Sequence, residues 1–187
     1  MFTEEINNAI KVLFEGGLIL YPTDMSWGIG CDATNDTAVD KILSLKRPKN
    51  VTALTCLVSN DAMLERYITK VPDLAYDLID LSTKPITIVY DQPKGIAKNL
   101  IAPDNTLAFN VATDKFCQYL IGNFKKPLVF TSANFPGGPI PKNFKEISEA
   151  VLKGVDYVVN LQHGSEYTVQ PSMIKLSNDG TVKVIRE

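Results

Sequence analysis

Residues 21–30, YPTDMSWGIG, bring hydroxyls, a carboxylate and two glycines together directly after a short apolar run. The apolar run predicts a strand, and the proline ends it. Strand ends are where α/β proteins tend to bind ligands, and glycines allow a ligand to approach the backbone closely. From its residues alone, this stretch is either a ligand-binding strand end or an ordinary polar turn.

Residues 46–50, KRPKN, place three cations after a predicted helix. Lysine and arginine at such a position can complement the negative end of the helix dipole in solvent. They can also bind phosphate, for which arginine offers a planar fork of donors and lysine a mobile point charge. Lys46 and Arg47 are therefore candidate phosphate ligands, and a solvated helix end is the alternative.

Residues 130–138, FTSANFPGG, begin at the end of another predicted apolar strand. Hydroxyls and an amide followed by glycines predict a small polar nest in an apolar wall. A turn formed by its serine and asparagine explains the stretch almost as well. None of the three stretches matches a Walker motif or a GxGxxG fingerprint, so no common phosphate loop is indicated.

Composition narrows the classes of function. The 187-residue chain carries 19 Lys and Arg against 21 Asp and Glu, a net charge of −2, which argues against a protein that coats nucleic acid by bulk electrostatics. Its three cysteines form no CxxC pair and His163 is the only histidine, so a Cys/His zinc site and a Ser-His-Asp machine are disfavoured. We expect His163 to be a solvated loop residue. The acidic N-terminal stretch and the short apolar runs predict a cytoplasmic protein without a signal peptide or membrane span.

Helix-like and strand-like patterns alternate along the chain with short loops between them. This alternation predicts one α/β domain, residues 1–187, built on a twisted mixed sheet flanked by helices. We expect helices from 3 to the glycines at 16–17 and over 35–45, 61–69, 73–81, 113–123 and 144–152, and strands over 18–21, 53–58, 86–90, 107–111, 128–131, 157–160, 172–176 and 182–185. The last strands follow one another without helices, so antiparallel pairing is expected there, with a hairpin turn at 178–180.

Four stretches together resemble the threonylcarbamoyl-adenylate synthase family in its short form. They are 21–24 (YPTD) with the glycines at 28 and 30, 46–48 (KRP), 131–134 (TSAN), and 172–174 (SMI) with 185–186 (IR). Each stretch is weak singly, but all four occur in the expected order over nearly the whole chain. The resemblance implies a twisted mixed sheet flanked by helices, with a concave and locally basic ligand cavity.

The resemblance also implies an activity. L-Threonine and bicarbonate combine to a carbamate that attacks the α-phosphate of ATP, and the ATP carries Mg²⁺ on its phosphates. Pyrophosphate leaves, and a partner complex transfers the threonylcarbamoyl group to adenosine 37 of tRNA. The implied site residues are Lys46 and Arg47 as catalytic cations, Thr23, Ser132 and Ser172 for the substrate, and Lys46, Arg47, Thr106, Asn134 and Arg186 for the nucleotide, with no metal-binding residue.

The chain departs from the family pattern at Met25, where a hydroxyl residue is typical. It also carries Asn110 where the corresponding family strand usually ends in an arginine that meets the amino-acid carboxylate. Lys46 and Arg47 are adjacent, whereas the family spaces them by one residue, and residues 83–87, TKPIT, replace a Pro-Gly-Pro-any-Thr turn. Two alternatives therefore stay open: a non-catalytic relative that binds nucleotide or RNA in the same cavity, and an enzyme that uses a different amine or acid.

Overall fold

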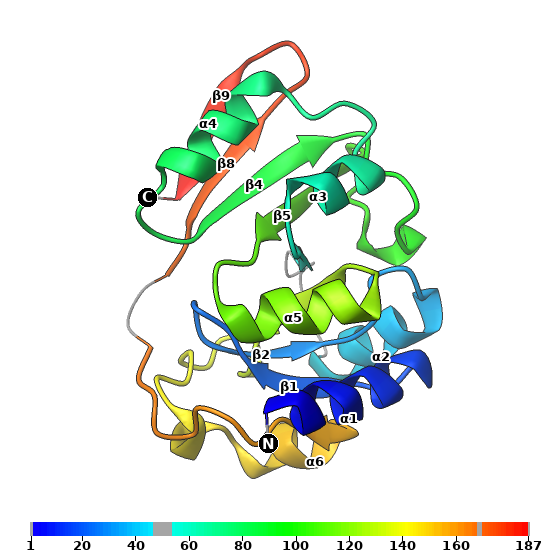
Figure 1. The fold of residues 1–187 in the computed structure, drawn as a ribbon, viewed down its shortest axis with the longest axis vertical. Coiled ribbons are helices and arrows are strands. Elements are labelled where there is room, and N and C mark those ends of the chain that lie inside the picture. The colour runs from blue at the N-terminus through cyan, green and yellow to red at the C-terminus, as the bar shows by residue number, and fades with distance from the viewer. Residues whose placement is uncertain (1, 47–53, 168–169, 187) are drawn as a thin grey trace.

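The computed structural model describes residues 2–46, 54–167 and 170–186, and within them nine strands form one mixed sheet. The strands lie in the order β7-β1-β2-β6-β3-β5-β4-β8-β9 (Figure 1). Their bounds are β1 Ile19–Pro22, β2 Trp27–Gly30, β3 Thr55–Val58, β4 Ile86–Asp91, β5 Thr106–Val111, β6 Leu128–Ser132, β7 Tyr157–Val158, β8 Ser172–Leu176 and β9 Val182–Arg186. The predicted α/β architecture with a mixed sheet is confirmed.

The helices of the described residues are α1 Phe2–Phe14, α2 Asp36–Lys46, α3 Asp61–Tyr67, α4 Asp73–Leu81, α5 Lys115–Phe124 and α6 Glu149–Gly154, with 3-10 turns η1 Lys98–Leu100 and η2 Phe144–Glu146. Side-chain caps start four of the α-helices, because Asn35, Asn60, Asp114 and Ser148 each accept a hydrogen bond from a first-turn backbone N–H. α1 packs against α5, where the Phe2 and Phe116 rings meet edge to face, and Figure 1 shows both helices on one side of the sheet. Across the described ranges, none of these helices combines the length and hydrophobicity of a membrane span.

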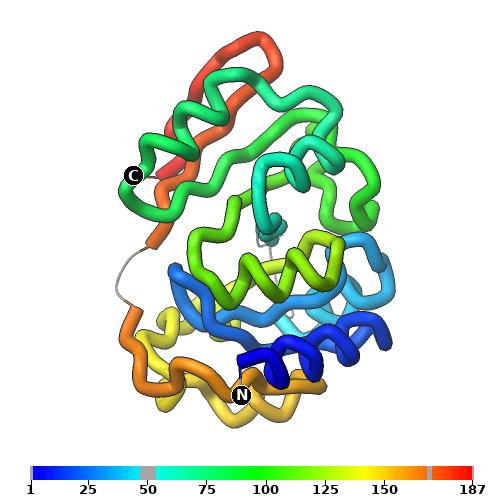
Figure 2. The backbone as a smooth tube through the Cα atoms, viewed as in Figure 1, coloured from blue at the N-terminus to red at the C-terminus, as the bar shows by residue number. Residues whose placement is uncertain are grey.

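The C-terminal hairpin completes one edge of the sheet. β8 lies parallel to β4, with Ser172 beside Ile86, and antiparallel to β9. The predicted turn between β8 and β9 is confirmed, since Gly180 N donates to Ser177 O over 2.9 Å and Gly180 has a φ of 87° that suits glycine. β7 pairs parallel with β1, so the antiparallel pairing expected of the last strands holds only for β8 and β9. Figure 2 shows this hairpin far from the N-terminal end of the chain.

Strand β2 was not predicted from the sequence, where residues 21–30 were interpreted as a ligand-binding strand end or a polar turn. Trp27–Gly30 pairs antiparallel with both β1 and β6. Glycines are depleted in strands, and the two glycines of β2 therefore gave this segment no strand signal in the sequence. Packing requires them here: a Cβ on Gly28 would lie 2.3 Å from the Phe130 ring, and a Cβ on Gly30 would lie 2.4 Å from Val129 O. The missing side chains let neighbouring atoms pack directly on the strand.

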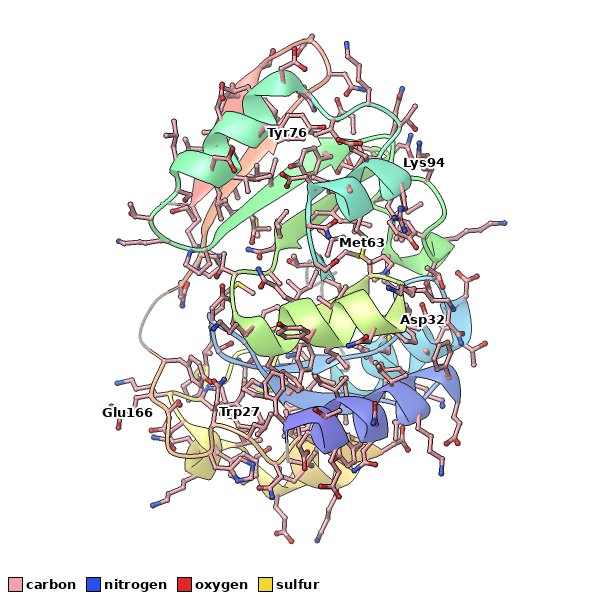
Figure 3. The ribbon with its side chains drawn as sticks, in the orientation of Figure 1. Trp27, Asp32, Met63, Tyr76, Lys94 and Glu166 are labelled. Atoms are coloured by element: carbon pink, nitrogen blue, oxygen red, sulfur yellow. The ribbon has the colours of Figure 1, made fainter. Side chains whose placement is uncertain are left out.

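The helix expected over residues 144–152 is also wrong, because η2 and α6 divide it. Ser148 caps the start of α6, whereas Phe144 belongs to the separate 3-10 turn η2. The Phe144 ring stacks on His163, with ring centroids 3.9 Å apart and an interplanar angle of 3°. The ring centroid of Trp27, a residue labelled in Figure 3, lies 5.1 Å from that of Phe144 and 5.4 Å from that of His163. His163 lies in a loop as expected, but it is half-buried in an aromatic cluster and is not a solvated residue.

Candidate functional site

A cavity of about 490 Å³ lies where several strands begin or end. Its wall combines these strand ends with residues from the segment between β6 and β8. The lining residues are Met25, Ser26, Thr55, Thr87, Phe130, Thr131, Ser132, Ile140, Lys142, Tyr167, Gln170, Pro171, Met173 and Arg186. Polar and cationic side chains in a partly apolar hollow of this size are typical of a small-molecule site.

Strand register explains why distant segments supply one wall. Directly paired residues on neighbouring strands point to the same side of a sheet, and alternate residues of one strand share a side. Three registered pairs lie on the cavity side: Phe130 with Thr55, Thr87 with Met173, and Met173 with Arg186. The order of strands, and not proximity in sequence, therefore builds the site.

Lys46 ends α2 and turns its ammonium group inward. The residue is 3% exposed, and its Nζ donates to Ser132 O over 2.7 Å and to Asn134 O over 2.5 Å. Burial lowers the pKa of Lys46 from its ordinary 10.5 to about 8. An ammonium group has three N–H donors, and the described residues accept two of them, which leaves a third for a ligand beside Ser132, a residue that lines the cavity.

The predicted polar nest after β6 is a closed hydrogen-bond network. Ser132 Oγ donates to Asn134 Oδ1 over 2.5 Å, and Asn134 Nδ2 donates to Gly138 O over 2.7 Å. Gly138 N in turn donates to Phe135 O over 3.0 Å. With Lys46 bonded to two carbonyls of the same segment, the network holds the end of β6 and the following loop in one arrangement.

Thr23 organises the turn between β1 and β2. Its Oγ1 donates to Ser26 O over 2.8 Å and accepts from Met25 N and Ser26 N over 3.1 and 3.2 Å. Thr113 Oγ1 donates to Asp24 Oδ2 and ties the turn to the segment that follows β5. The Thr23 hydroxyl is thus committed to the turn, and it positions two residues that line the cavity, Met25 and Ser26.

Asn110 lies on β5 and is 2% exposed. Its Nδ2 donates to Ile86 O over 2.7 Å and lies 3.9 Å from Met25 Sδ. Its Oδ1 is buried and has no hydrogen-bond partner among the described residues. Such an unsatisfied buried acceptor costs roughly 1–3 kcal/mol, so this side of the cavity differs from the closed network after β6.

Arg186 and Ser172 lie where the last two strands reach the cavity. The Arg186 guanidinium lines the cavity and donates to Pro171 O from Nε over 3.0 Å and from Nη2 over 2.8 Å. Ser172 begins β8 between two lining residues, Pro171 and Met173, and pairs with Ile86.

Thr106, another residue assigned to the nucleotide, is not among the described residues that line the cavity. Thr106 begins β5, and its Oγ1 donates over 2.6 Å to Asp104 Oδ1, whose carboxylate also pairs with Lys175. The Thr106 hydroxyl is used in this local hydrogen bond, and the role of Thr106 in nucleotide binding stays a prediction. Arg47 lies outside the described residues.

Sequence reasoning missed the loop side of the cavity. Lys142 and Tyr167 come from separate parts of the segment between β6 and β8 and are joined by a 2.7 Å bond from Tyr167 N to Lys142 O. Burial raises the pKa of Tyr167 to about 12, so its hydroxyl is neutral at physiological pH. Neither residue belongs to a periodic pattern or motif, so no sequence signal marked them.

A family model for the Sua5/YciO/YrdC domain, described as telomere recombination, matches residues 11–187. The chain is 32% identical over 177 residues to the threonylcarbamoyl-AMP synthase of Pseudoalteromonas translucida, which covers 93% of this chain and 94% of that protein. It is also 32% identical over 162 residues to the threonylcarbamoyl-AMP synthase of Photobacterium profundum, covering 81% of this chain and 87% of that protein. These relatives therefore match this chain along most of their own length.

Solved structures share the fold. The crystal structure of E. coli YciO matches with a TM-score of 0.83 at 25% identity and covers 97% of this chain and 88% of that chain. P. abyssi Sua5 in complex with L-threonine matches with a TM-score of 0.81 at 23% identity and covers 91% of this chain. The present chain spans 50% of that Sua5 chain, and so about half the length of the longer protein.

Proposed function

Because the chain belongs to the Sua5/YciO/YrdC family, we infer that it is a threonylcarbamoyl-AMP synthase. In the proposed reaction, L-threonine and bicarbonate condense to a carbamate with loss of water, and the carbamate and ATP give threonylcarbamoyl-AMP and pyrophosphate. The likeness to synthases of that name along nearly the whole chain carries this assignment. The cavity supports it, because it gathers cations and hydroxyls at converging strand ends.

The chemistry is a displacement at phosphorus, which proteins accelerate mainly by positioning reactants and neutralising charge. In the proposed step a carbamate oxygen attacks the α-phosphorus of ATP, and pyrophosphate leaves with the electrons of the bond that breaks. We assign stabilisation of the phosphate charge to Arg47 and to Lys46, through the third N–H donor of Lys46, for which the described residues supply no acceptor. Hydrogen bonds from a charged donor to phosphate oxygens are the stronger kind.

The remaining residues divide between the nucleotide and the amino acid. We propose that Asn134 and Arg186 hold the nucleotide and that Ser132 contacts the threonine. Thr23 acts indirectly, because its hydroxyl is used to shape the turn that carries Met25. Ser172 has the corresponding part on β8, where it sets the strand start beside the lining residues Pro171 and Met173.

Magnesium and the tRNA pathway complete the proposal. Among the described residues, no group of three or more His, Cys, Asp or Glu side chains is arranged to hold a metal ion. We propose that Mg²⁺ enters on the ATP phosphates as part of the substrate, as is common where phosphates supply the ligands. Bicarbonate supplies the carbamate carbon, and a separate transfer complex delivers the product to tRNA.

Pyrophosphate release from ATP, measured with and without L-threonine in bicarbonate and magnesium, tests the assignment. We expect threonine-dependent release, with threonylcarbamoyl-AMP detected by mass spectrometry. Buffer depleted of bicarbonate is the matched control, in which product should fall. ATP binding without threonine-dependent release would contradict the synthase assignment.

A further inference from the structure

The amide of Asn110 is held in one orientation. Ile86 O can only accept a hydrogen bond, so the 2.7 Å contact identifies the bonded atom of Asn110 as Nδ2. The carbonyl oxygen, Oδ1, therefore points away from Ile86, and it is buried without a partner among the described residues. Buried acceptors are nearly always satisfied in folded proteins, which makes this one a candidate ligand contact.

Asn110 also lies on the cavity side of its strand. It follows Ala108 by two residues and so shares its face of β5, and Ala108 pairs with Thr55, which lines the cavity. Met25, which contacts the Asn110 amide, and Thr87, which follows Ile86, are lining residues as well. Asn110 is not itself among the described lining residues, and its amide lies directly against the lining residue Met25.

The chemistry of this position selects a donor. Carboxylate and phosphate oxygens cannot satisfy Asn110 Oδ1 at neutral pH, because they only accept. Threonine carries a hydroxyl and a methyl group on the same carbon, and the methyl group suits a thioether such as that of Met25. An unbranched methionine side chain has three rotatable bonds and can move aside to admit both groups. The lining cation Lys142 remains available for the carboxylate of the amino acid.

We propose that Asn110 Oδ1 accepts the hydrogen bond of the threonine hydroxyl, with Met25 against the threonine methyl group, and that this contact sets the preference for threonine. The inference rests on the proposed synthase function. It makes Asn110 a specificity-determining residue of the amino-acid site.

The test compares L-threonine with L-valine, which has nearly the same shape without the hydroxyl. Sites that hydrogen-bond a substrate hydroxyl reject such an analogue strongly, whereas apolar pockets discriminate weakly. We expect the wild-type kcat/KM for pyrophosphate release to favour threonine over valine by at least about 100-fold, and Asn110→Leu to narrow that ratio at least about ten-fold. Asn178→Leu is the matched control: Asn178 Oδ1 is also buried and unpartnered among the described residues but lies at the β8–β9 turn, so the ratio should not change.

An active Asn110→Leu variant with an unchanged threonine-to-valine ratio would overturn the proposal. If that variant has no turnover, calorimetry with a non-hydrolysable ATP analogue decides: equal affinities for the two amino acids support the proposal, and wild-type threonine preference overturns it. Circular dichroism verifies that the variant is folded. A wild type without threonine-dependent release contradicts the synthase assignment instead, and calorimetry of the same two amino acids still tests Asn110.

Discussion

The cavity has two walls that differ in how completely their polar groups are satisfied. Around the end of β6, Lys46, Ser132 and Asn134 form hydrogen bonds with one another and with the following loop. On the β5 side, Asn110 Oδ1 is buried and has no partner among the described residues, while Asn110 Nδ2 lies 3.9 Å from Met25 Sδ. We refer to these as the β6 wall and the β5 wall.

The difference indicates a division of tasks. A satisfied hydrogen-bond network keeps its geometry before a ligand binds, so its side chains need little reorganisation during the reaction. An unsatisfied acceptor gains most from a ligand that supplies the missing donor and penalises one that does not. The β6 wall should therefore govern the rate of the phosphate chemistry, and the β5 wall should govern the choice of amino acid.

Replacing Lys46 by methionine should break the β6 wall and give the largest effect. Two carbonyl oxygens lose their partner, so we expect the free energy of unfolding to fall by about 2–4 kcal/mol and threonine-dependent pyrophosphate release to fall at least about 100-fold. Urea denaturation and the pyrophosphate assay measure the two quantities. Lys41→Met is the control, because Lys41 Nζ also donates to a carbonyl, Gly16 O at 2.7 Å, outside the described lining; it should lose stability and keep its turnover. Wild-type turnover in Lys46→Met would show that the β6 wall does not contribute to catalysis.

Substituting Gly28 by alanine should deform the β6 wall from its apolar side. The new Cβ would lie 2.3 Å from the Phe130 ring, which must move, and we expect a loss of about 1–3 kcal/mol in the free energy of unfolding together with weaker ATP binding. Gly122→Ala on α5 is the control: no heavy atom lies within 4 Å of its added Cβ, and alanine should stabilise the helix by about 0.5–1 kcal/mol. Equal stability of the two variants would show that the Phe130 ring is free to shift.

Asn134→Ala removes a hydrogen bond of the β6 wall without removing a charge. The loop to Gly138 loses its side-chain hydrogen bond, so ATP affinity measured by calorimetry should fall about ten-fold, with about 1 kcal/mol lost in stability. Asn123→Ala removes a comparable bond, 2.9 Å from Nδ2 to Tyr119 O, on the exposed part of α5 and should leave ATP affinity unchanged. A threonine-to-valine ratio that changes in Asn134→Ala would mean that the two walls are coupled.

The ionisation of Lys46 should give the smallest effect. Its pKa is about 8 in the folded protein and 10.5 ordinarily, so between these values the folded state binds fewer protons than the unfolded state. Stability therefore rises with pH through this window. The free energy of unfolding of the wild type should gain about 1 kcal/mol over that of Lys46→Met between pH 7 and 9, measured by urea denaturation. A constant difference between the two proteins would show that the Lys46 pKa is not lowered.

Most of the helices and strands, and part of the candidate site, could be predicted from the sequence. Apolar alternation predicted the strands later found as β4, β5 and β8, because burial of one or both faces leaves a local pattern. It could not predict their order, which depends on pairings between distant segments. Ser132 and Lys46 were predicted by position at a strand end and a helix end. The two carbonyl partners of Lys46, the unpaired oxygen of Asn110 and the local bond of Thr106 depend on three-dimensional neighbours, which no spacing records.

The pairing of β4 with β8 has a consequence for how the protein is made. Ile86 must pair with Ser172 before that side of the cavity forms. Closing so long a loop costs entropy, and this cost slows folding. During translation, β4 leaves the ribosome long before β8, and its free edge can meanwhile pair with other chains. Until β8 has been made, β4 therefore lacks its parallel neighbour, and this side of the cavity is not yet formed.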